Sequence, residues 1–232
     1  MLPRLAGALA AALLLGTAAS AEPNEGVAFA GGAAGDGLSG YAGLVHALPG
    51  AELGKGLAVR GSLSGGSYEY DSSGVRIDGR FEAAEAALVY QLSGRWGWAN
   101  FSAGPRISDV SLSPRDPSND RQGTRLDLAV QSDGALLLDS SWRLGWLGSL
   151  GVRDGTYYSR AEIGRIVEPR SQTRLGLEAG LQGDPNYRSS SLGLFAATKL
   201  GPNLEGRVSA GASDQEGRHA RPYATLGLSL LF

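Results

Sequence analysis

The chain has 232 residues, a formal net charge of −2, 36 glycines and no cysteine. A charge this close to zero provides no basic footprint for nucleic acid, so we expect no nucleic-acid partner. The lack of cysteine excludes disulfides and thiol chemistry, and with only His46 and His219 available we expect neither a structural zinc site nor a cofactor. Abundant glycine favours strands and tight turns over a helical bundle.

The first 21 residues have the pattern of a secretory signal peptide. Arg4 supplies the positive charge, Leu5–Gly16 is an apolar core, and Ala19-Ser20-Ala21 is a small-residue cleavage site. The core is shorter than the roughly 20 residues of a membrane span, which disfavours an N-terminal membrane anchor. We therefore expect residues 22–232 to form a single exported domain.

Apolar side chains recur at every second position through most of this domain, and no apolar run approaches the length of a transmembrane helix. That combination is typical of a membrane β-barrel. The expected strands are Gly26–Ala33, Leu38–Leu48, Leu57–Tyr70, Val75–Leu92, Ala99–Ser113, Thr124–Leu138, Trp142–Val152, Thr156–Arg165, Thr173–Gly183, Ser190–Leu200, Leu204–Ser213 and Pro222–Phe232. The fold class predicted is all-β, a transmembrane antiparallel β-barrel of about 12 strands. An even count places both chain ends on one side of the membrane, which we expect to be the periplasm.

One expected strand, Val75–Leu92, changes its apolar parity midway. Val75, Ile77 and Phe81 share one parity, whereas the apolar residues from Ala84 to Leu92 share the other. A change of parity within one strand predicts a β-bulge, here near Glu82–Ala83.

The connections alternate between short turns and more polar loops. With a periplasmic start, the most polar stretch, Pro114–Gly123, becomes an extracellular loop. Asp116, Asn119 and Asp120 in this loop could hold calcium, but the glycine and terminal glutamate of an EF-hand loop are absent, so solvation explains them better.

The last strand, Pro222–Phe232, alternates Ala224, Leu226, Leu228 and Leu230 with small or polar residues and ends on an aromatic ring. It resembles the final strand of outer-membrane barrels. That likeness implies that the terminal strand, with Tyr223 and Phe232, is an assembly signal, and that the partners include outer-membrane lipid and the barrel assembly machinery.

If lipid contacts the apolar rows, the opposite rows line the lumen. The candidate lumenal residues are Arg60, Arg125, Asp127, Arg143, Arg153, Arg160, Glu162, Arg174, Glu178, Lys199, Glu205 and Arg207. Desolvated charges need partners, and the sequence suggests Arg160 and Glu162 near Arg174 and Glu178, with Lys199 near Glu205 and Arg207. We favour a filled lumen in which ion pairs brace the wall, since strand number limits the interior width. The alternative is a narrow pore for anionic or polyhydroxylated solutes.

Two further alternatives are weaker. A soluble lipocalin-like barrel would have the opposite polarity, with its apolar rows inside. A membrane-embedded lipase or acyltransferase would need a serine, a histidine and an acid together, and neither His46 nor His219 lies beside a Gly-x-Ser-x-Gly element. We therefore expect no enzymatic activity.

Several tracts resemble the cellulose biosynthesis protein BcsS family of outer-membrane proteins. They are Gly40-Tyr41-Ala42-Gly43 with Leu48-Pro49-Gly50, Trp96-Gly97-Trp98-Ala99-Asn100, Ser102-Ala103-Gly104-Pro105-Arg106, Gln131-Ser132-Asp133-Gly134 and Glu178–Tyr187. The resemblance implies a location in the bacterial outer membrane, a role in cellulose (exopolysaccharide) synthesis or export as conduit or scaffold, and cellulose or cellulose-secretion components as partners. It brings no catalytic residues. A small general porin or structural barrel unrelated to cellulose remains the alternative.

Overall fold

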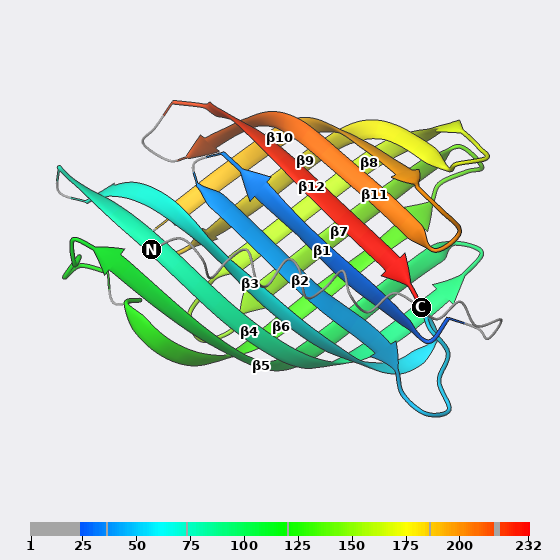
Figure 1. Ribbon diagram of the computed structural model, residues 1–232, viewed down its shortest axis with the longest axis horizontal. Helices are drawn as coiled ribbons and strands as arrows, with labels where there is room; N and C mark the ends of the chain where they lie inside the picture. The colour runs from blue at the N-terminus through cyan, green and yellow to red at the C-terminus, as the bar shows by residue number, and fades with distance from the viewer. Residues whose placement is uncertain (1–23, 36, 73, 120, 186, 216–218) are drawn as a thin grey trace.

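The structure is a computed structural model that describes residues 24–35, 37–72, 74–119, 121–185, 187–215 and 219–232. Within these residues the chain forms twelve antiparallel strands closed into one barrel (Figure 1). The strands are β1 (Gly26–Ala34), β2 (Leu38–Ala47), β3 (Gly56–Ser72), β4 (Val75–Gly94), β5 (Gly97–Ser113), β6 (Gly123–Leu137), β7 (Trp142–Gly151), β8 (Tyr157–Glu168), β9 (Thr173–Asp184), β10 (Tyr187–Lys199), β11 (Leu204–Gln215) and β12 (Arg221–Leu231). The predicted antiparallel barrel is confirmed. The predicted signal peptide lies outside the described residues, which contain no helix able to cross a membrane.

The barrel closes where the first strand meets the last. β1 pairs with β12 from Val27 opposite Leu231 to Ala34 opposite Ala224, and the two strands lie side by side in Figure 1. The backbone N–H groups of Glu25 and Gly26 donate to the Phe232 carbonyl at 2.7 and 2.9 Å. Closure leaves no strand edge unpaired, which is what a bilayer requires of a sheet.

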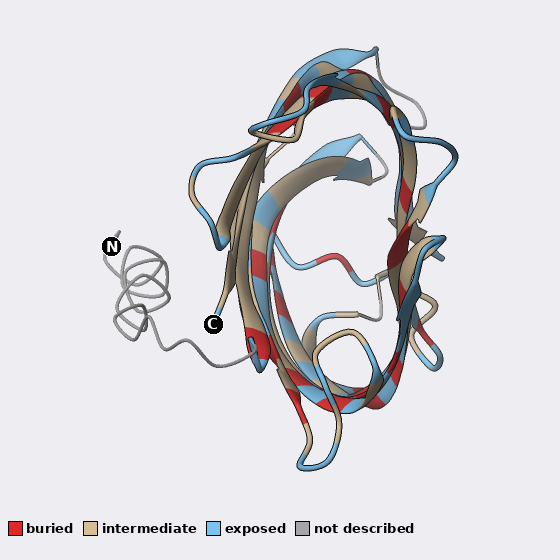
Figure 2. Ribbon diagram, turned by 90° about the vertical axis from the view of Figure 1, so that its right-hand side faces the viewer, coloured by how far each residue is buried: buried red, intermediate tan, exposed pale blue. Residues whose placement is uncertain are grey.

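Because the strand number is even, both chain ends lie at the same end of the barrel. We call the end with Gly26 and Phe232 the terminal end, and the opposite end the distal end. In a view turned by 90° about the vertical axis from that of Figure 1, the wall has an elongated, oval outline rather than a circular one (Figure 2).

Three neighbouring strands are longer than the rest. β3, β4 and β5 have 17, 20 and 17 residues, whereas a tilted strand needs about 9–11 to cross a bilayer. The pairing of β2 with β3 stops at Gly66, so the last six residues of β3 extend past β2 at the distal end. This part of the wall therefore extends beyond the band that lipid would cover.

The outward face of the sheet carries the apolar rows. Leu126, Leu192 and Leu194 are 62%, 66% and 65% exposed, and exposed leucines recur at every second position along most strands. A contiguous apolar surface of this extent does not face water in soluble proteins. The lipocalin-like alternative, which needs these residues inside, is therefore wrong.

The bulge predicted near Glu82–Ala83 is absent over the described residues. β4 pairs with β3 without a register shift from Val75 to Gln91, and Ile77, Val89 and Gln91 are buried on one continuous face. The parity changes because the environment changes: near the distal end the lumen is apolar and the outer face is polar. Ile77 there forms a buried cluster with Val110 and Leu112, against which Tyr68, Tyr70 and Phe81 pack.

Candidate functional site

The lumenal face is identified by contacts between strands that are not neighbours in the sheet. Arg207 on β11 bonds to Glu162 on β8, and Tyr223 on β12 bonds to Glu178 on β9. Side chains separated by three strands can meet only across the concave side of the wall. Most of the charged residues singled out in the sequence lie on this side, in two separate networks.

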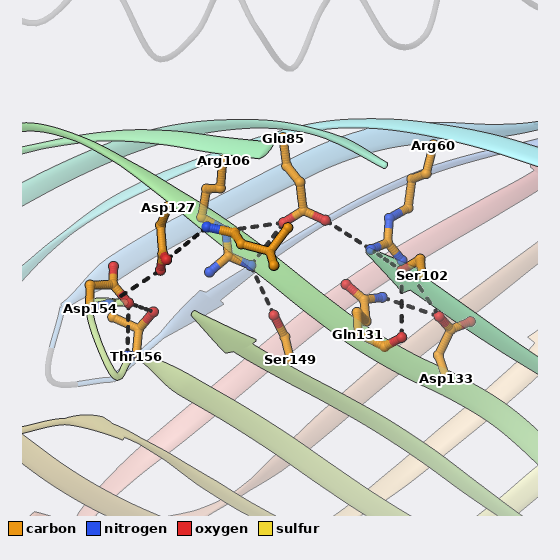
Figure 3. A network of polar contacts seen from close by, with 11 residues as sticks. Arg60, Glu85, Ser102, Arg106, Asp127, Gln131, Asp133, Ser149, Asp154 and Thr156 are labelled. Carbon is orange, nitrogen blue, oxygen red and sulfur yellow. Dashed lines mark hydrogen bonds and ion pairs between the residues drawn. The ribbon is translucent and has the colours of Figure 1, made fainter. Parts of the chain in front are cut away.

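The first network joins β3, β4, β5 and β6 through the carboxylate of Glu85 (Figure 3). Arg60 donates to Glu85 at 2.8 Å and to the Ser102 hydroxyl at 2.7 Å, and it lies 3.7 Å from Asp133. Arg106 donates to the other oxygen of Glu85 through Nε at 3.0 Å and Nη2 at 2.8 Å. The two arginines thus share one buried acid, and their charges are balanced by Glu85 and Asp133.

Neutral polar side chains extend this network along the wall. Gln91 donates to Asn100 at 3.3 Å, and Asn100 donates to Asp133 at 2.9 Å. Arg106 also reaches the Ser149 hydroxyl on β7 at 2.9 Å. Hydrogen bonds therefore run continuously from β4 to β6, with a branch to β7.

Asp127 has a different role from a pore-lining charge. It is buried and accepts backbone N–H bonds from Leu128 at 2.7 Å and Arg153 at 2.8 Å. Next to it, Asp154 accepts from the backbone N–H and the hydroxyl of Thr156. Asp127 thus shapes the β7–β8 turn, and Arg153 is an exposed residue of that turn beyond the end of β7.

The second network joins β8, β9, β11 and β12 around Arg207. Its Nη2 donates to Glu162 at 2.9 Å and also bonds to Glu178. Glu178 is 4% exposed and accepts from the Tyr223 hydroxyl at 2.6 Å. The Arg207 guanidinium carbon lies 5.0 Å from the centre of the Phe195 ring, so a cation–π contact adds to the two ion pairs.

Two further arginines in this network differ in how well they are paired. Arg174 on β9 donates to Glu205 on β11 at 2.8 Å and is 5% exposed. Arg160 comes no closer than 4.0 Å to Glu162. The pairs suggested from sequence, Arg160 and Glu162 with Arg174 and Glu178, are thus replaced by pairs to β11.

The remaining candidates lie toward the rims. Arg125 is half-buried on the same face of β6 as Asp127. Lys199 is exposed at the end of β10, where its register partner is Glu205, the carboxylate that Arg174 binds.

Several residues of the first network were missed in the sequence, above all Glu85, Arg106 and Asp133. They share the inward parity of Val89, Ser102 and Gln131 respectively, so the alternation alone could have identified them.

The two predicted assembly residues lie in different environments. Tyr223 points inward to Glu178, whereas the Phe232 ring stacks on His46 at the terminal rim with centroids 6.3 Å apart. His46 therefore packs against the closing strand and, like the exposed His219, is not part of either lumenal network.

The loop between β5 and β6 is tied to the distal end. Asp116 is buried and accepts from the Tyr70 hydroxyl at 2.8 Å and from the Ser118 hydroxyl at 2.6 Å, while Asn119 donates to Tyr70 at 3.0 Å. These bonds, that of Ser118 first, lower the pKa of Asp116 to about 2. Of the residues once considered for calcium, Asp120 lies outside the described part, and within that part no group of potential metal ligands gathers.

On the other side of this loop, Arg121 forms ion pairs with Asp184 at the end of β9 and with Asp154 at 3.9 Å. The loop thus links the distal ends of β3, β7 and β9.

The solved structures to which this chain is similar include outer-membrane proteins. The COG4313 outer membrane channel from Pseudomonas putida F1 is similar with a TM-score of 0.57 at 13% identity, over 92% of this chain and 97% of that one. The KdgM porin gives 0.48 at 12% identity, over 89% and 99%. The translocator domain of the autotransporter NalP from Neisseria meningitidis gives 0.47 at 14%, over 98% and 95%.

Among curated proteins no sequence matches this chain. The family described as Cellulose biosynthesis protein BcsS matches residues 27–232, which is nearly the whole of the barrel. The apolar outer face, the closed sheet and this match agree with one another and with the resemblance in the sequence. The protein is therefore an outer-membrane β-barrel that belongs to the cellulose biosynthesis protein BcsS family.

Proposed function

We propose that this barrel serves cellulose export as a non-enzymatic scaffold in the outer membrane, and that the glucan does not pass through it. The observation that carries the proposal is a set of polar contacts that bridge strands two and three apart: a hydrogen bond from β3 to β5, and ion pairs from β3 to β6, from β9 to β11 and from β8 to β11. A polymer moving through the lumen would have to displace buried, paired charges, which is costly.

The distal end supports the same role. The β5–β6 loop is held by Tyr70 on one side and by Asp154 and Asp184 on the other. Such a cross-linked loop stabilises a wall better than it accommodates the passage of a chain.

A second candidate is a narrow conduit for sugars. It is favoured by two tyrosines on the lumenal face, Tyr41 on β2 and Tyr158 on β8, which are 43% and 38% exposed although the barrel surrounds them. Aromatic faces combined with polar groups are suited to sugar rings.

A pair of glycine substitutions separates the two roles. Gly227 on β12 faces the lumen, and a Cβ there meets nothing closer than 3.5 Å, so Gly227→Phe would add bulk to the lumen. Gly61 on β3 faces outward with nothing within 4 Å, so Gly61→Phe is the matched control. Each variant is expressed in a strain lacking the gene, and secreted cellulose is measured by dye binding.

We expect the gene deletion to lower secreted cellulose and both variants to restore it. If Gly227→Phe fails while Gly61→Phe succeeds at equal outer-membrane levels, the barrel is a conduit. If deletion leaves cellulose unchanged, the link to cellulose is wrong for this chain.

The histidine variants His46→Ala and His219→Ala test the enzyme alternative. We expect both to retain cellulose secretion, and a loss of secretion would support an enzyme instead.

We also propose that the barrel assembly machinery recognises the last strand through Phe232. Deleting this residue is expected to lower the amount of heat-modifiable barrel in the outer membrane. An unchanged amount would show that the terminal ring is dispensable.

A further inference from the structure

The charges of the second network do not balance. On the lumenal face from β7 to β11 the described residues include four arginines, Arg143, Arg160, Arg174 and Arg207. They face three carboxylates, which are those of Glu162, Glu178 and Glu205. The arginines therefore outnumber the carboxylates by one, and Lys199, exposed at the end of β10 opposite Glu205, adds a further cation at the rim, unlike in the first network.

The excess falls on Arg143. Glu205 is bound by Arg174 at 2.8 Å, and Glu162 by Arg207 at 2.9 Å. Arg143 lies within electrostatic range of Arg174, Glu205 and Glu162, yet its guanidinium makes no hydrogen bond or ion pair with any described residue.

One charge of the same sign that acts on Arg143 is that of Arg174, which is 5% exposed. The Nε atoms of Arg143 and Arg174 are both buried and have no acceptor within the described part of the chain. Each guanidinium thus keeps an unused N–H donor in a region where two cations repel one another, an unfavourable arrangement that a bound anion would relieve.

Both arginines lie close to the terminal end, since each is the second residue of its strand, β7 and β9. Planar guanidinium groups bind carboxylate and phosphate oxygens in a bidentate manner. We infer that Arg143 and Arg174 form a lumenal binding site for one small oxyanion, a carboxylate or phosphate group, reached from the terminal end. The inference does not depend on the cellulose role.

The test uses the mature barrel folded in detergent, with thermal unfolding followed by gel mobility. Sodium glucuronate, inorganic phosphate and neutral glucose are added at constant ionic strength kept with sodium chloride. We expect saturable stabilisation by at least one of the two oxyanions and none by glucose. The oxyanion whose effect saturates at the lower concentration shows whether the site prefers a carboxylate or a phosphate group.

Arg143→Gln should fold, because it removes a cation that has no acidic partner. It should bind the anion more weakly, so that the half-saturating anion concentration rises about tenfold or more. The matched control is Arg165→Gln. Arg165 is exposed on β8, and its register partner is Trp142, the residue that precedes Arg143 in the chain. The control should behave as the wild type. Equal stabilisation of Arg143→Gln and wild type, or no saturable effect in the wild type, would overturn the site.

A second measurement observes the site in the wild-type protein. The Nε–Hε resonances of wild-type arginines are recorded during the same titration, with Arg143 assigned from the conservative variant Arg143→Lys. We expect the Arg143 signal to shift with the saturation curve. A signal that stays constant would overturn the site.

Discussion

The two polar networks of the lumen solve the same physical problem in different ways. In the first, Arg60 and Arg106 converge on Glu85, and Asp133 supplies the second negative charge, so cations and carboxylates match. In the second, three carboxylates serve four arginines, and Arg207 alone bonds to both Glu162 and Glu178. The first network has the character of a brace, whereas the second keeps one cation available.

This difference shows that a charged lumenal wall need not have a single purpose. A balanced, buried set of ion pairs is rigid, and breaking it leaves a buried charge without a partner. A set with an excess cation can rearrange after the loss of one member. Substitutions in the two networks should therefore lower the free energy of unfolding by different amounts.

The largest effect is expected for Glu85→Ala. It leaves Arg60 and Arg106 without their shared acid, and the Arg60 side chain is 4% exposed. Loss of one partner of a buried pair typically costs about 3–5 kcal/mol. Urea unfolding of the barrel in detergent measures the change, and Glu82→Ala, on the exposed outer face of the same strand, is the control. A loss no greater than that of the control would contradict the bracing role.

A smaller effect is expected for Arg207→Gln. Glu162 and Glu178 lose their main partner, but Arg160 and Arg143 are near Glu162 and can compensate. We expect a loss of about 1–3 kcal/mol in the same assay, in the range of one unsatisfied buried group. A loss as large as that of Glu85→Ala would remove the distinction between the networks.

The distal end, outside both networks, should respond to acid. Because the folded-state pKa of Asp116 is lowered to about 2 from an ordinary value of 3.8, its bonds stabilise the fold above pH 4. This contribution is lost as the pH falls from about 4 through 2. The wild type should therefore unfold at a higher temperature than Asp116→Asn at pH 6, and the difference should shrink steeply between pH 4 and pH 2. A difference of the same size at pH 6 and at pH 2 would show that the carboxylate is not responsible.

The smallest effect is expected for Arg76→Ala on the outer face of β4. Arg76 lies 3.8 Å from Glu69 and 4.0 Å from Asp71, but its side chain is 62% exposed. Exposed pairs of this kind contribute about 0–1 kcal/mol. A urea-unfolding change above that range would show that the extended part of β3–β5 is more important to stability than its exposure suggests.

Much of the barrel was predictable because a strand in a bilayer has one face in lipid. The period of two located the strands to within a few residues, and it placed Arg207, Glu162 and Glu178 on the inner face. The same rule failed in β4, because it assumes that the apolar side faces lipid along the whole strand. At Ile77 and Phe81 the apolar side faces inward, beyond the lipid band.

The pairing of the charges could not be predicted. Whether Arg174 meets Glu205 or Glu162 depends on register and tilt, which bring together residues two or three strands apart. Neighbouring strands in the sequence suggested that Arg174 lies near Glu162, whereas the structure joins Arg174 on β9 to Glu205 on β11. Three-dimensional curvature, rather than sequence distance, decides these contacts.

The most direct test of the account compares two positions on β2 that are similarly exposed but face opposite sides. Tyr41 is 43% and Leu44 39% exposed, and the chain has no cysteine, so a single cysteine at either position can carry a spin label in reconstituted bilayers. We predict that the label at position 44 is more accessible to oxygen, which partitions into lipid, and that the label at position 41 is more accessible to a water-soluble relaxing agent. The reverse order, or equal accessibility at the two positions, would contradict a lipid-facing apolar surface around a polar lumen.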